Sequence, residues 1–202
     1  TTVKGLFSAG DGTGASSHKF SSGSHAEGRW AAKEAVRFIV DNNSQPNATG
    51  VDELKAKCLE PLDVYEANCK FTSDPMINPN YILPMQFMFR MQKIMDEYAG
   101  GVVSAFKTSK ALCDRGLELM VMLKEDAEKM GAKDRYDLER CWENYQRMWQ
   151  GEAHLRTILF REETRWPGYY FRADKPKMDP AWKVFCNCTY KNGTWEFVKR
   201  DV

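Results

Sequence analysis

The sequence predicts an α+β fold that is mainly α, and three stretches of the chain indicate it. A short apolar segment at residues 3–9 runs into a glycine-rich loop and then into a helix. Two long helical patterns, at residues 109–130 and 135–161, follow each other with a short loop, which is typical of an antiparallel helical hairpin. Thr108 or Ser109 can cap the first helix and Asp134 the second. Near the end, Asn192 and Gly193 separate two alternating segments, the pattern of a β hairpin. We therefore expect a strand, glycine loop and helix, then a helical bundle, then a small C-terminal β hairpin.

The glycine-rich stretch organises the beginning of the chain. Its apolar content predicts a buried strand at residues 3–9. The glycines of residues 10–14 then allow a tight turn and a close approach of the backbone, although their spacing is not that of a dinucleotide fingerprint. Residues 21–24 open a helix that we expect from about residue 24 to 40. Backbone N–H groups at a helix start lack partners in the helix and favour negative charge, so the stretch predicts a place for an anion or a polar cofactor edge.

The middle of the chain is predicted to be helical with interruptions. A helix at about residues 51–58 precedes Pro61, and residues 62–69 form a separate short helical turn. A further helix is expected at residues 81–98, and the glycine pair that follows it marks a candidate domain boundary.

The composition excludes several classes of function. The net charge is +1, so no electrostatic attraction to nucleic acid or to an anionic membrane is expected. No apolar run reaches the length of a membrane span. No secretory signal is visible, which predicts a cytoplasmic protein. The chain begins at Thr1 inside a predicted strand, so we expect it to be a piece of a longer protein.

The six cysteines match no disulfide or zinc spacing. We interpret them as reduced, buried thiols and predict no metal site in this chain. The alternative rests on Cys186 and Cys188, which a strand would place on one face and which would then be the metal-binding candidates.

Few residues have the chemistry of a catalytic site. His18 lies beside Lys19 just before a helix, where an imidazole suits an anionic substrate or general-acid catalysis. Asp11 either caps a turn or accepts hydrogen bonds from sugar or ribityl hydroxyls. His25 is compatible with a structural or a functional role, whereas His154 is predicted to be a hydrogen-bonded structural histidine.

Residues 161–165, Arg-Glu-Glu-Thr-Arg, allow two interpretations. They are either a solvated helix end or a salt-bridge cluster that locks the helices onto the first domain, and the sequence favours neither.

The residues around the glycine loop resemble a known family. Residues 5–11, Gly-Leu-Phe-Ser-Ala-Gly-Asp, are similar to the second FAD-contacting strand of the succinate dehydrogenase and fumarate reductase flavoproteins. Residues 22–29 resemble the helix start that points N–H groups at the flavin in that family. Residues 18–29 replace the Asn-Arg-Leu-Gly pattern of the dicarboxylate enzymes and resemble the branch of adenylylsulfate reductase alpha subunits, and residues 161–174 support the same branch.

The resemblance implies a domain plan and a cofactor. Residues 1–100 would be the C-terminal portion of an FAD-binding domain, residues 101–165 a helical domain, and residues 166–202 a C-terminal segment with the β hairpin. FAD would be held noncovalently by two sets of residues. They are Gly10, Asp11 and Gly12 at the ribityl chain, and Ser22, Gly23 and Ser24 at the flavin ring.

The resemblance also implies a reaction. The family enzyme reversibly reduces adenylyl sulfate to sulfite and AMP through a flavin N5–sulfite adduct. His18 and Lys19 match its catalytic position. Electrons would pass through an iron–sulfur beta subunit carrying two 4Fe–4S clusters, in a heterodimer. The present chain would be part of the catalytic subunit and inactive by itself.

Two alternatives stay open beside this interpretation. One is a flavoprotein of the succinate dehydrogenase and fumarate reductase type, which His18 and Lys19 in place of the Asn-Arg pair disfavour. The other is a helical interaction module without chemistry, in which the glycine loop is only a tight turn.

Overall fold

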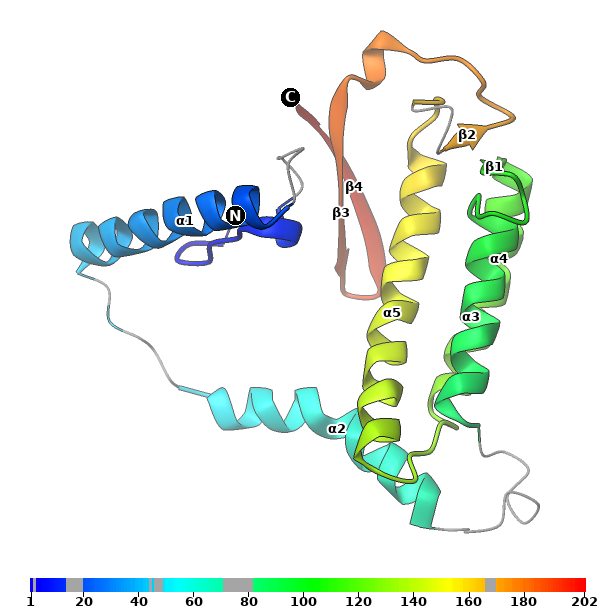
Figure 1. Ribbon diagram of the computed structural model, residues 1–202, viewed down its shortest axis with the longest axis horizontal. Coiled ribbons are helices and arrows are strands. Elements are labelled where there is room, and N and C mark those ends of the chain that lie inside the picture. The colour runs from blue at the N-terminus through cyan, green and yellow to red at the C-terminus, as the bar shows by residue number, and fades with distance from the viewer. Residues whose placement is uncertain (2, 14–19, 44, 46–48, 71–81, 166–169) are drawn as a thin grey trace. The chain divides into compact units, whose positions relative to one another are not determined.

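The computed structural model describes residues 1, 3–13, 20–43, 45, 49–70, 82–165 and 170–202, with the backbone alone at residues 69 and 70 (Figure 1). The chain divides into two compact units, Thr1–Leu54 and Lys55–Val202. Helix α3, which the sequence places in the first predicted domain, packs against α4 and α5 in the second unit. The predicted domain limits at residues 100 and 165 stay predictions.

The first unit contains a short 3₁₀ turn and one long helix. The turn η1 (Gly10–Gly12) packs against α1 (Ser21–Asn42), and Asn43 ends α1 in the left-handed conformation with φ of 44°. Residues 21–24 form the first turn of α1, so the prediction that they open a helix is confirmed. The helix is slightly longer at both ends than the expected residues 24–40.

The strand predicted at residues 3–9 is wrong. Residues 3–6 form a turn, in which Leu6 N–H donates to the Val3 carbonyl at 3.2 Å and Gly5 has φ of 77°. The apolar side chains are not buried, since Val3 is 60 % and Leu6 55 % exposed. A strand needs a neighbour to pair its N–H and C=O groups, and the strands described in this structure pair with one another in the second unit.

Helix α2 (Val51–Lys70) runs through Pro61 without a break, so the prediction of two separate helical pieces is wrong. A proline inside a helix removes one hydrogen bond and strains the preceding turn. The segment after it is held by packing, because Tyr65 is 2 % exposed and belongs to the core. The Asn68 amide also donates to the Glu128 and Met130 carbonyls at 2.7 and 2.6 Å.

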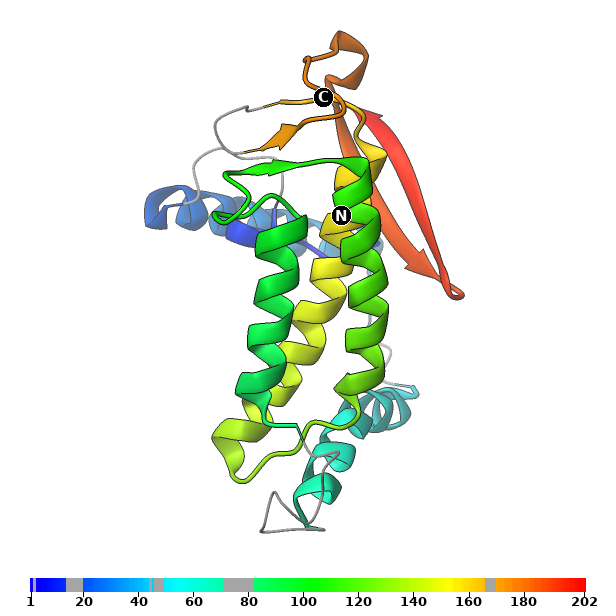
Figure 2. The same ribbon diagram turned by 90° about the vertical axis from the view of Figure 1, so that its right-hand side faces the viewer.

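Three helices form the bundle of the second unit: α3 (Pro84–Tyr98), α4 (Lys110–Ala127) and α5 (Arg135–Phe160). Figure 2 shows them side by side, and each packs against the other two. Two predicted caps are confirmed. The Ser109 hydroxyl accepts from Leu112 N–H at 3.3 Å, and the Asp134 carboxylate accepts from the N–H groups of Tyr136 and Asp137 at 2.9 Å.

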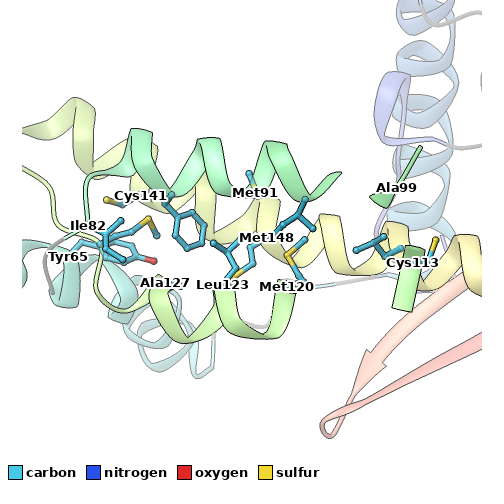
Figure 3. Close-up of a cluster of buried hydrophobic side chains, with 14 of the residues drawn as sticks. Tyr65, Ile82, Met91, Ala99, Cys113, Met120, Leu123, Ala127, Cys141 and Met148 are labelled. Carbon is cyan, nitrogen blue, oxygen red and sulfur yellow. The ribbon is translucent and has the colours of Figure 1, made fainter. Parts of the chain in front are cut away.

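The core of the second unit lies between these helices. Figure 3 shows its side chains, from Tyr65 and Ile82 at one end to Cys113 at the other, with Met120 and Met148 between them. Methionine fills irregular gaps because its side chain is unbranched and adaptable. Phe87, Met91, Met120 and Met148 are therefore core, whereas Trp142 on α5 is 41 % exposed.

Two small strand pairs complete the unit. Strands β3 (Val184–Lys191) and β4 (Thr194–Asp201) form the predicted antiparallel hairpin, in which Lys191 pairs with Thr194. Asn192 and Gly193 both have positive φ, at 51° and 81°, as a two-residue hairpin turn of this kind requires. Strands β1 (Lys107–Thr108) and β2 (Phe171–Arg172) form a short parallel pair that the sequence did not indicate. The predicted class, mainly α with a C-terminal hairpin, is confirmed.

Candidate functional site

The glycine turn is fixed in an unusual backbone geometry. Gly10 is buried and has φ of 65°, in the left-handed region that glycine adopts most readily. Its carbonyl accepts from Thr13 N–H at 2.9 Å, which closes the turn. Its N–H donates to the Glu27 carboxylate of α1 at 2.7 Å. The turn is therefore tied both to itself and to the helix that follows it.

The turn lies so close to its surroundings that a side chain at either of its glycines would be crowded. A Cβ atom added at Gly10 would lie 3.3 Å from the Ser24 hydroxyl, and one added at Gly12 would lie 3.0 Å from the Ser8 hydroxyl. Asp11, between them, is exposed. Figure 1 shows η1 next to the first turns of α1. The residues predicted to contact a cofactor, Gly10, Asp11, Gly12, Ser22, Gly23 and Ser24, therefore lie together in the first unit.

The start of α1 has the features of an anion-binding helix end. The N-cap residue, Phe20, has no polar side-chain atom, and within the described part of the chain no side chain caps the helix. The first turn contains no acidic residue. Ser24 N–H makes the first bond back along the helix, to the Phe20 carbonyl at 2.9 Å. The N–H groups of the preceding residues point out of the helix end, where they favour a negatively charged or carbonyl oxygen.

The remaining candidate residues are Lys19 and the three histidines. His18 and Lys19 lie outside the described residues. His25 is exposed near the start of α1. The prediction of a hydrogen-bonded structural histidine is wrong for His154, which is exposed on α5 and lines a groove of about 660 Å³ between α3 and α5. The groove floor is mostly apolar, with Met91 and Met95 among its lining residues.

Arg161, Glu163 and Arg165 form a buried ionic cluster, so this segment is a salt-bridge cluster and not a solvated helix end; its described partners, however, lie in the C-terminal segment and not in the first predicted domain. Glu163 is 0 % exposed and accepts from Arg161 at 2.6 Å, from Arg165 at 2.6 and 3.0 Å, and from Asp179 N–H at 2.9 Å. Burial opposes ionisation, but these hydrogen bonds outweigh it and lower the pKa of Glu163. Arg161 also donates to the Trp182 and Val184 carbonyls. Among the described residues, the cluster thus holds the end of α5 to the C-terminal segment.

A second buried carboxylate attaches the hairpin to the bundle. Glu152 of α5 is 3 % exposed and accepts from Lys124, from Arg156 at 2.8 Å and from the Trp195 indole at 3.0 Å. Burial raises the pKa of its carboxyl, but the hydrogen bonds from Lys124 and Arg156 outweigh burial and lower it. Since Trp195 lies on β4, this cluster has a structural role.

The described cysteines differ in their exposure. Cys113 and Cys141 are fully buried, as predicted, whereas Cys58 is exposed. Cys186 and Cys188 are half-buried on β3. Within the described part of the chain, no group of three histidine, cysteine or carboxylate side chains is placed to hold a metal ion, and no helix is both long and apolar enough to cross a membrane.

The sequence interpretation missed Glu27, which reaches from α1 to the Gly10 amide. The sequence did contain a signal for a backbone contact of Glu27. Ser24 and Glu27 have the spacing of a capping box, in which the glutamate side chain accepts a hydrogen bond from a backbone N–H at the helix start. Since α1 begins at Ser21, Glu27 lies in its second turn and is not part of such a cap. Its carboxylate binds the glycine turn instead.

Comparison with known proteins connects the turn and the helix to a flavoprotein fold. No model of a known protein family matches the chain. The chain is 48 % identical over 193 residues to the adenylylsulfate reductase subunit alpha of Megalodesulfovibrio gigas, a match that covers 94 % of this chain and 29 % of that protein. The present chain therefore spans less than a third of the length of this relative.

Solved structures give the same result. The adenylylsulfate reductase of Archaeoglobus fulgidus is 48 % identical and superposes with a TM-score of 0.88, over 100 % of this chain and 32 % of that one. An adenosine-5-phosphosulfate reductase in complex with sulfite, as a covalent adduct, matches equally well. The quinol fumarate reductase of E. coli, at 18 % identity and a TM-score of 0.74, shares the fold over 99 % of this chain and 34 % of that one. In sequence and in fold, the chain is thus similar along nearly its whole length to the C-terminal region of the adenylylsulfate reductase alpha subunit.

Proposed function

We propose that this chain is part of the FAD-containing catalytic subunit of an adenylylsulfate reductase, an oxidoreductase that reversibly reduces adenylyl sulfate to sulfite and AMP. The observation that carries the proposal is 48 % identity over 94 % of the chain to a protein of that name. A solved relative that holds sulfite as a covalent adduct supports the sulfur chemistry. The chain contributes one part of the site, because it spans less than a third of the relative.

The residues of the first unit fit FAD. The left-handed Gly10 turns the backbone back towards the start of α1, which brings Asp11 and the helix start to one place for an extended ligand. Asp11 would hold a ribityl hydroxyl. The N–H groups at Ser22 and Gly23, which precede the first bond of the helix, would stabilise the negative charge of the reduced flavin at its pyrimidine edge, with Ser24 beside them in the same turn. FAD, bound noncovalently, would supply the electron pair that reduces the sulfur.

His18 and Lys19 are the proposed catalytic residues. Both precede the start of α1, whose positive end attracts anions. The His18 imidazole, as a hydrogen-bond donor or cation, would stabilise charge that develops on the sulfonyl oxygens or on the departing AMP phosphate. Lys19 would add positive potential for the same doubly anionic region of the substrate.

The proposal extends to a partner and a compartment. Electrons would pass between the flavin and a separate iron–sulfur beta subunit with two 4Fe–4S clusters, in a heterodimer in the cytoplasm. The partner is implied by the name of the relative, which is a subunit alpha.

Two oxidation assays on the complete protein test the function. The complete subunit with its iron–sulfur partner is expected to reduce ferricyanide with sulfite only when AMP is present, and to leave succinate unoxidised. The fold shared with fumarate reductase makes succinate the informative competitor. Oxidation of succinate without AMP-dependent oxidation of sulfite would contradict the proposal and favour the dicarboxylate branch.

A further inference from the structure

We infer that Glu27 is a positioning residue, which holds the Gly10–Gly12 turn against α1 in the one arrangement that lets both segments contact the same cofactor. The inference rests on the proposed function, because the cofactor is the FAD proposed above. It assigns to Glu27 a role that acts through the backbone of Gly10 and not through direct contact with the flavin.

The hydrogen bond between the two residues is strong for its kind. Gly10 N–H donates to Glu27 Oε2 at 2.7 Å, at the short end of the range for bonds to a carboxylate. Gly10 is buried, and Glu27 is half-buried on the second turn of α1. A buried N–H without its acceptor is strongly destabilising, so the turn depends on a side chain that comes from 17 residues further along the chain.

The same face of α1 makes a second contact with the turn. Ser24 lies three residues before Glu27, so their side chains are neighbours on the helix surface. The Ser24 hydroxyl approaches the position that a Gly10 Cβ would occupy to 3.3 Å. Gly10 is thus fixed by the hydrogen bond that its N–H donates to Glu27 and by close packing against Ser24. Both side chains come from the helix whose N-terminal end is the proposed flavin contact.

This arrangement couples the two halves of the proposed cofactor site. Asp11, which follows Gly10 directly, is the proposed ribityl contact, and Ser22 to Ser24 are the proposed flavin contacts. A shift of the turn along α1 would move the Asp11 carboxylate relative to the start of this helix. By accepting from Gly10, Glu27 sets that spacing before the cofactor binds, which reduces the ordering cost of binding.

The test compares three variants in the complete subunit from which FAD has been removed and to which it is added back. Glu27→Ala removes the acceptor, whereas Glu27→Gln keeps a carbonyl oxygen at the same reach. Glu34→Ala is the matched control, because Glu34 lies on the same helix but is exposed and paired only with Arg37, at 2.8 Å, among the described residues. The readouts are the dissociation constant of FAD, from the quenching of its fluorescence, and the visible spectrum of the flavin at saturation.

Glu27→Ala is expected to weaken FAD binding about tenfold or more and to shift the flavin spectrum. Glu27→Gln is expected to remain within about threefold of the unsubstituted protein, and Glu34→Ala to equal it. The inference is overturned if Glu27→Ala binds FAD normally, or if Glu27→Gln loses affinity as fully as Glu27→Ala. It is also overturned if thermal denaturation of the FAD-free protein shows that the loss follows only from a smaller folded fraction. An unsubstituted subunit that binds no FAD would instead contradict the proposed function.

Discussion

The two compact units bury their apolar side chains to very different extents. In the first unit, the 22 residues of α1 include none that is buried, and Trp30 and Val40 are 68 % and 73 % exposed. In the second unit, α3, α4 and α5 share one core, in which Phe87, Met120 and Leu155 are 0 % exposed. Burial of apolar side chains thus stabilises the second unit, whereas a few local contacts hold the first together.

This difference separates what stabilises the fold from what shapes the candidate site. Burial of apolar surface supplies most of the free energy of folding. The specific features of the first unit, the left-handed Gly10 and its bond to Glu27, bury little surface but fix the backbone. Substitutions in the second unit should therefore change the free energy of unfolding, and substitutions in the first should mainly change binding and turnover.

The largest expected effect on stability is in the core of the second unit. Phe87→Ala should lower the free energy of unfolding of the chain by about 4 kcal/mol, because it leaves a cavity at a fully buried site. Phe38→Ala in the first unit removes a half-buried ring that meets the Phe7 ring edge-on at 6.2 Å, and should cost about 1 kcal/mol. Urea denaturation measures both. Equal losses would contradict the contrast between the units.

The internal control for the core substitution is Phe89→Ala. Phe89 lies on α3 as Phe87 does, but it is 60 % exposed. Its removal should change stability by less than about 0.5 kcal/mol.

A slightly smaller loss is expected at the ionic cluster. Glu163→Ala leaves the Arg161 and Arg165 guanidinium groups, which are 19 % and 24 % exposed, without their carboxylate. Breaking a buried pair in this way should cost about 3 kcal/mol. Glu162→Ala, one residue earlier and 58 % exposed, is the matched control and should cost about 0.5 kcal/mol or less. If both variants unfold at the same urea concentration, the cluster does not stabilise the second unit.

The smallest expected effect is a loss of folding stability at low pH, through Asp174. Two hydrogen bonds from Arg172, at 2.9 and 2.7 Å, lower the pKa of Asp174 to about 2. A depressed pKa in the folded state adds stability above the unfolded value near 4, and this stability is lost as the pH falls from about 4 towards 2. Asp174 should therefore contribute a loss of about 1 kcal/mol between pH 5 and pH 3, given its partial exposure. In Asp174→Asn that part of the pH dependence should disappear; an unchanged acid profile would contradict it.

Local signals predicted the second unit well. The caps at Ser109 and Asp134 and the turn at Asn192 and Gly193 depend on residues within a few positions of each other, and all three form as expected. The core stripes also follow from helical spacing. These features can be predicted without knowing which segments far apart in the sequence come into contact.

Features that depend on distant partners could not be predicted. The segment at residues 3–9 has strand composition but no described neighbour to pair with, and α2 continues through Pro61 because Tyr65 packs into the core. In the site, the glycine turn and the helix start were predicted from composition, but the bond that joins them was not. It links Gly10 and Glu27 across 17 residues, a contact that only the fold creates.

The catalytic role of His18 in the complete enzyme is the central claim, and one kinetic measurement tests it most directly. The measurement is the turnover number for AMP-dependent oxidation of sulfite in His18→Ala, with FAD content determined on the same sample. The control is His154→Ala, which removes an exposed histidine of the second unit. We predict that His18→Ala keeps its FAD and loses about 100-fold or more in turnover, while His154→Ala retains full activity. Unchanged turnover in His18→Ala, with FAD bound, would contradict the catalytic role of His18.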